Sequence, residues 1–195
     1  MKRWAAVVLA VVLGGVSGGL SAQEKQTEAK AEEARPIRQL SWLEGGVWVA
    51  DASKLAPGMQ RIETRYEWAD NNAYLHFTTH FVFDKGTMKN YDGNLYWDPQ
   101  KSSLAIWYMD AGGAITQGPM EWNGDMLRVL FHGPDFEGKI ADLKVEVTRL
   151  SNQHYHWMVA EKQADGWKQL GALEYLRQGE AAPGKRAAPA SANGR

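Results

Sequence analysis

The chain has 195 residues, a formal net charge of −1 and no cysteine. This length predicts a single domain, and the near-zero charge without a basic stripe argues against a nucleic-acid partner. Without cysteines, the protein must fold without disulfides.

The N-terminus has the pattern of a secretory signal peptide, residues 1–22. Lys2 and Arg3 precede an apolar run over residues 4–16, and small residues follow up to Ala22. These three features are typical of a cleavable signal, whereas a membrane-spanning helix needs about 20 apolar residues. We therefore expect cleavage after Ala22, a mature chain without a membrane span, and a periplasmic or secreted protein. No cysteine follows the signal to carry a lipid.

Two further segments flank the expected domain. Residues 23–38 are charged and alanine-rich without an apolar face, which predicts a solvated tether. Residues 178–195 combine alanine, proline and glycine with scattered charge, which predicts a disordered tail. The folded unit should be residues 39–177, and a domain near this size buries on the order of 70% of its unfolded surface.

Inside this unit, residues 40–44 are expected to form a short helical turn that ends at Gly45 and Gly46. A first strand over residues 47–50 leads to a hairpin with arms at residues 61–69 and 73–83. Its side chains alternate between polar and apolar, the period of two of a half-buried strand. Seven more strand-like runs, rich in aromatic and β-branched residues, are separated by turn signals: residues 94–97, 103–109, 114–122, 126–132, 140–150, 154–162 and 167–177.

The short connections decide the architecture. They leave no room for crossover helices, so successive strands must be antiparallel neighbours. An open sheet of ten strands would leave long exposed edges, which closure into a barrel removes. A two-sheet sandwich needs longer return loops, and only residues 51–60 and 133–139 approach that length. The sequence therefore predicts an all-β, antiparallel up-and-down β-barrel of about ten strands.

One strand has an unusual composition. Residues 103–109 are apolar on both faces, so the outer face needs a cover. We expect the N-terminal helical turn or another subunit to provide it, and favour the helical turn.

The segment from Trp42 to Trp48, with Gly46-Val47-Trp48 after the helical turn, resembles the opening of the calycin superfamily, which includes lipocalins, fatty-acid-binding proteins and nitrobindin. Its Leu-x-Gly-x-x-Trp spacing is similar to bacterial secreted lipocalin-like domains of unknown function. The resemblance implies that Trp48 closes the barrel floor under an arginine from a late strand, in a cation-π contact. Arg177, or in second place Arg149, would fill that role. The chain lacks the Thr-Asp-Tyr type motif and the disulfide of true lipocalins.

The aromatic content points to the barrel interior. Nine tryptophans are many for this length, and they can fill a barrel or line an apolar cavity with a few polar groups. Packing is the more common use, and both interpretations stay open. The predicted function is binding of a small apolar or amphipathic ligand, without a cofactor and with the oligomeric state undetermined. The ligand-lining candidates are Thr64, Tyr66, Trp68, Phe77, Thr79 and Phe81.

Histidine spacing offers an alternative function. His154 and His156 share one face of a strand about 7 Å apart at the backbone, near enough to bind one metal ion. A haem site like that of nitrobindin would need a lumenal histidine, for which His154, His156 or His132 could serve. His76 and His80 are about 13 Å apart on a strand, so we expect partly exposed cross-strand partners and no metal site there.

No catalytic constellation is apparent in the sequence. It has no cysteine, no Gly-x-Ser-x-Gly elbow and no glycine-rich phosphate loop that opens a helix. Glu121 and Asp110 lie at strand ends, where charge normally meets solvent, so they do not predict a carboxylate pair. We therefore expect a protein that is not an enzyme. A further alternative is an interaction module that docks a partner through the outer face of residues 103–109.

Overall fold

The computed structural model describes residues 36–135 and 138–179. The predicted signal peptide, residues 23–35 of the tether and the tail after Gly179 lie outside the described residues. Within these residues, no helix is both long and apolar enough to cross a membrane.

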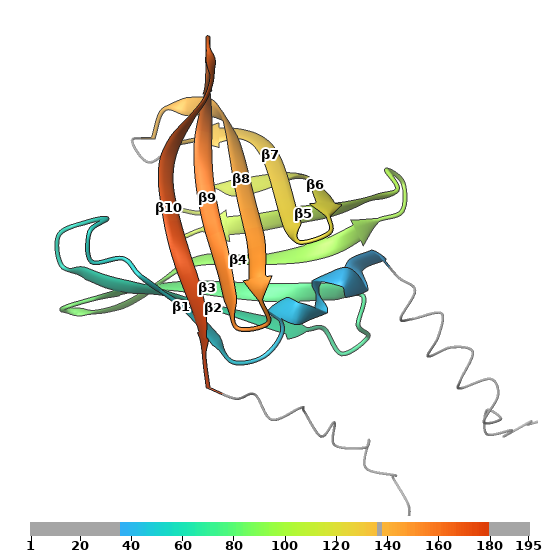
Figure 1. The fold of residues 1–195 in the computed structure, drawn as a ribbon, viewed down its shortest axis with the longest axis horizontal. Helices are drawn as coiled ribbons and strands as arrows, with labels where there is room; N and C mark the ends of the chain where they lie inside the picture. The colour runs from blue at the N-terminus through green and yellow to red at the C-terminus, as the bar shows by residue number, and fades with distance from the viewer. Residues whose placement is uncertain (1–35, 136–137, 180–195) are drawn as a thin grey trace, which may run out of the picture. The chain divides into compact units, whose positions relative to one another are not determined.

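Ten antiparallel strands form a closed barrel in which each strand pairs with its neighbours in sequence, and β1 pairs with β10 to close the ring (Figure 1). This confirms the predicted up-and-down barrel. The elements are η1 (Pro36–Leu43), β1 (Val47–Asp51), β2 (Met59–Trp68), β3 (Tyr74–Phe83), β4 (Gly86–Asp98), β5 (Ser103–Asp110), β6 (Ile115–Asn123), β7 (Met126–Pro134), β8 (Ile140–Ser151), β9 (His154–Gln163) and β10 (Gly166–Gln178).

The alternation along the strands fixes the inside of the barrel. In β2, Ile62 and Thr64 are buried, whereas Arg65 and Glu67 are exposed. This is the orientation that the period-two pattern predicts. A similar alternation runs through most of the other strands, but a bulge in β10 breaks it, and residues 170–173 of that strand all line the cavity.

Two elements begin several residues before their predicted starts. The 3₁₀ helix η1 begins at Pro36, inside the segment predicted as tether, because Ile37 and Leu40 are both buried. Residues three apart share one face of a 3₁₀ helix, so both side chains reach the core. Strand β4 begins at Gly86 instead of residue 94, because its polar first half pairs with β3. Cross-strand pairing there outweighs the weak strand propensity of the residues.

Helix η1 packs against the end of the barrel. Trp42 contacts Trp48 of β1, Trp122 of β6 and Tyr155 of β9, with ring centroids 5.8, 6.4 and 5.9 Å away. These three strands lie around the ring of the barrel, so the helix covers one opening. The expectation that it covers the outer face of residues 103–109 is therefore wrong, and Met109 on that face is exposed.

Glycine at position 93 allows two strands to approach closely. A Cβ atom there would lie 2.4 Å from the carbonyl oxygen of Trp107 and 2.5 Å from the Cβ of Tyr108. We expect Gly93→Ala to lower the free energy of unfolding by about 1–3 kcal/mol, as overpacking of a core does. Urea unfolding measures the change.

Gly133→Ala in β7 is the matched control, because a Cβ atom at Gly133 meets the Phe131 ring at an ordinary distance of 3.5 Å. Its expected change is within about 0.5 kcal/mol. Equal effects of the two substitutions would contradict the role given to Gly93.

Candidate functional site: the barrel cavity

The barrel interior contains a cavity of about 600 Å³. Leu55 and Ala56 of the β1–β2 connection belong to its lining, as do Pro134 and Asp135 at the end of β7. Both connections lie at the end of the barrel opposite η1, because η1 directly precedes β1 and successive strands alternate in direction. The cavity therefore reaches the open end of the barrel, and η1 lies at the closed end.

The cavity takes in most of the predicted ligand-lining residues. Its lining includes Thr64, Tyr66, Phe77, Thr79 and Phe81. Trp68 is not part of it. Trp68 is the last residue of β2. Its ring lies 4.5 Å from the guanidinium carbon of Arg38, a residue of η1. Trp68 thus belongs to the closed end.

The barrel floor is built around Trp48, which is fully buried. The guanidinium carbon of Arg177 lies 4.5 Å from the Trp48 ring centroid, the contact that the family resemblance implies. Arg177 also donates hydrogen bonds to the carbonyl oxygens of Glu44, at 2.8 Å, and Trp42. The Trp48 indole donates to the carbonyl oxygen of Leu43 at 2.7 Å. These contacts fasten the first strand, the last strand and the helix together. Arg149, the second candidate, lies over Trp42 instead.

Five tyrosines contribute to the polar lining, and of these the sequence pattern pointed to Tyr66 alone. The tyrosines in the lining are Tyr66, Tyr91, Tyr108, Tyr155 and Tyr175. Burial raises the pKa of Tyr66 and of Tyr108 to about 12, and it also raises the pKa of Tyr155 and Tyr175. A phenol with an ordinary pKa near 10 is already protonated at neutral pH, and burial extends this range into alkali, so these hydroxyls serve as hydrogen-bond donors.

The raised tyrosine pKa values predict a loss of stability in alkali. Between pH 10, the ordinary pKa, and about pH 12, the unfolded chain loses protons that Tyr66 and Tyr108 keep in the folded state. The unfolded state then binds fewer protons, so the free energy of unfolding falls as the pH rises. Their contribution is fully present below pH 10. Urea midpoints across this range measure the fall.

Tyr66→Phe should make this fall shallower, because the variant has one buried phenol fewer. Tyr74→Phe is the control, since Tyr74 is exposed. If both variants followed the wild-type pH profile, the tyrosine explanation would be excluded.

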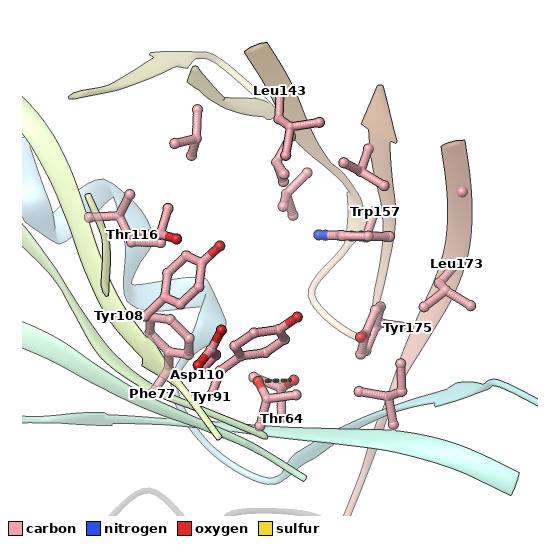
Figure 2. A pocket seen from close by; sticks show the side chains of 18 of the residues that line it. Thr64, Phe77, Tyr91, Tyr108, Asp110, Thr116, Leu143, Trp157, Leu173 and Tyr175 are labelled. Atoms are coloured by element: carbon pink, nitrogen blue, oxygen red, sulfur yellow. Dashed lines mark hydrogen bonds between the residues drawn. The ribbon is translucent and has the colours of Figure 1, made fainter. Parts of the chain in front are cut away.

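The lining residues from β7 and β8 are apolar, whereas β2 to β5 contribute polar and apolar residues side by side, such as Tyr108 and Phe77 (Figure 2). The hydroxyls of Thr64 on β2 and Thr79 on β3 form a hydrogen bond of 3.0 Å. The side chains of Tyr108 on β5 and Thr116 on β6 also form a hydrogen bond. Strands β7 and β8 present an apolar surface instead. Its residues are Leu127, Val129, Phe131, Leu143, Val145 and Val147. The cavity is therefore amphipathic.

Asp110 lines the cavity, although its position at a strand end predicted a solvent-facing side chain. It is the last residue of β5 and lies directly opposite Tyr91 of β4. Its Oδ1 accepts hydrogen bonds from the backbone N–H groups of Gly112 and Ala114 at 2.8 and 2.9 Å. These bonds hold the carboxylate at the turn, beside the open end of the cavity.

The histidine candidates lie on the outside of the barrel. His154 Nε2 and His156 Nδ1 contact the carboxylate of Glu174 at 2.6 and 2.7 Å. Partial burial acts to raise the pKa of Glu174, but the bonds to His156 and His154 lower it overall. His132 pairs with Asp142 at 2.9 Å. Strand alternation turns these side chains outward, so none of them is the lumenal histidine that a haem site would need.

The described residues were also compared with the side-chain groups that hold metal ions. Across residues 36–135 and 138–179, no group of three His, Cys, Asp or Glu side chains is placed to hold a metal ion. His76 bonds to Asp92 of the neighbouring strand at 2.7 Å, the cross-strand pairing expected from its position.

No protein-family model matches the sequence, and no curated protein gives a significant match. The function must therefore be inferred from the cavity itself.

Proposed function

We propose that this protein is a secreted or periplasmic calycin-like barrel that binds a small apolar or amphipathic molecule in its lumen. The cavity carries the proposal. Its volume of about 600 Å³ lies within the range of roughly 300–1,000 Å³ for small-molecule sites. Its lining is mainly apolar and aromatic with a few convergent polar groups, which is the usual composition of such sites.

Membership of the calycin superfamily is supported by the closed ten-strand barrel and by the Arg177–Trp48 contact at its floor. Export is supported by the charged start, apolar run and small residues over positions 1–22. A lipocalin-like role follows from these two features together with the cavity.

Binding without catalysis fits the chemistry of the lining. Its tyrosines hold their protons at neutral pH, as a phenol with an ordinary pKa near 10 already does, and burial raises the pKa of Tyr66 and Tyr108 further, to about 12, so they donate hydrogen bonds. Both hydrogen bonds of Asp110 stabilise a turn.

Native mass spectrometry of freshly purified protein, before and after solvent extraction, tests the proposal. We expect an additional bound mass that extraction removes. The emptied protein should then bind N-phenylnaphthylamine, a neutral apolar fluorophore, and unfold at a higher temperature in its presence. A ligand at 100 times its dissociation constant stabilises a protein by about 2.7 kcal/mol. A consistently empty protein that binds no fluorophore would refute the proposal.

A further inference from the structure

Among the described residues, those of the cavity lining that carry a charge are acidic. They are Asp110 and Asp135, and none of the described lining residues is Lys, Arg or His. An anionic headgroup that moved from water into this lumen would find no positively charged partner among the described lining residues. Burial of an unpaired charge is costly. The lining charge thus disfavours a fatty-acid carboxylate and favours a cation.

Two tyrosines are neighbours of Asp110 in the barrel wall. Tyr91 is its cross-strand partner, and Tyr108 lies two residues earlier on the same face of β5. The Tyr91 and Tyr108 rings pack edge to face at 5.2 Å, and Phe81 lies 5.9 Å from Tyr91. Figure 2 shows Asp110, Tyr91, Tyr108 and Phe77 gathered on one side of the cavity.

A carboxylate beside aromatic faces is suited to an organic ammonium ion. The carboxylate supplies a full charge, and the negative faces of the rings attract a cation. Quaternary ammonium groups are recognised in this way by aromatic cages.

We propose that the lumen prefers a cationic amphiphile, with its ammonium group beside Asp110, Tyr91 and Tyr108 and its apolar body along β7 and β8. The inference rests on the proposed function, because it names the chemical class of ligand for the same cavity. Val129 and Val145, which are cross-strand partners in the lining, form part of the surface for the apolar body.

Three probes with the same decyl chain test the preference: decyltrimethylammonium, decanol and decanoate. Each displaces N-phenylnaphthylamine from the wild-type chain, below its micelle concentration. We expect decyltrimethylammonium to bind about tenfold more tightly than decanol, a difference of about 1.4 kcal/mol, and decanoate to bind most weakly. Decanol binding without a preference for the cation would overturn this inference and leave the proposed function standing. Failure of all three probes to bind would overturn both.

Asp110→Asn isolates the charge. The amide keeps an Oδ1 acceptor for the N–H groups of Gly112 and Ala114 but removes the negative charge. We expect it to weaken decyltrimethylammonium binding about tenfold and to leave decanol binding unchanged. An equal loss for both probes would overturn the inference.

Asp142→Asn is the control, because Asp142 lies on the outer face of β8 with 59% of its side chain exposed. It changes the net charge of the chain equally and should leave the affinity for all three probes unchanged. The ranking of the probes on the wild-type chain decides the inference even if Asp110→Asn does not fold.

Discussion

Trp48→Ala should lower the free energy of unfolding by about 3–5 kcal/mol, the usual cost of truncating a buried tryptophan. The ring is fully buried and lies 4.7 Å from the Tyr155 ring and 4.5 Å from the Arg177 guanidinium carbon. Its removal leaves a cavity and deprives Arg177 of its aromatic partner. It also leaves the carbonyl oxygen of Leu43 without its indole donor. Urea unfolding, with the midpoint and the slope fitted separately, measures the loss.

Trp167→Ala provides the matched control. Trp167 is 41% exposed, and its one cation-π contact, with Lys144 Nζ, is 5.3 Å long. Removal of this ring should cost less than about 1 kcal/mol, since exposed cation-π pairs contribute about 0.5–1 kcal/mol. Equal losses from the two tryptophans would mean that Trp48 does not organise the barrel floor.

The sequence is sufficient for the barrel and for much of its interior surface. Strict alternation in β2 predicts that Thr64 and Tyr66 face inward, and both line the cavity. The same rule fails for Trp68, because alternation gives the face of the sheet but not the depth along the barrel axis. Trp68 ends β2 at the closed end, where Arg38 of η1 covers it. Its role depends on the position of a helix that the strand pattern does not contain.

Three polar lining residues, Tyr91, Asp110 and Tyr155, were harder to predict, for reasons specific to each. Tyr91 precedes the predicted start of its strand at residue 94, so the pattern assigned it no face, whereas it lies within β4. Asp110 ends a strand, where charge normally meets solvent, but its turn holds it at the cavity. Tyr155 lies between His154 and His156, and the alternation that turns both histidines outward points Tyr155 into the lumen.

The existence of the cavity could not be derived from the sequence. Whether ten strands enclose empty space depends on the tilt and stagger that set the barrel diameter, and on the sizes of the side chains that meet inside. Next to the apolar surface of β7 and β8, Val145 pairs with Val129 of β7 on one side and Val159 of β9 on the other. Three short side chains at one level leave space that larger residues would fill.

Val145→Trp should therefore weaken N-phenylnaphthylamine binding at least about 100-fold, or about 2.8 kcal/mol, because the indole would occupy the lumen. Since the new ring enters a cavity of about 600 Å³, it should destabilise the fold less than the usual 1–3 kcal/mol of overpacking. Fluorescence titration and urea unfolding measure the two effects. Leu130→Trp is the control. Leu130 of the neighbouring strand is 44% exposed, so this substitution adds the same ring on the outside of the barrel. Wild-type affinity in Val145→Trp would show that the fluorophore binds elsewhere, and the lumen would lose its assigned role.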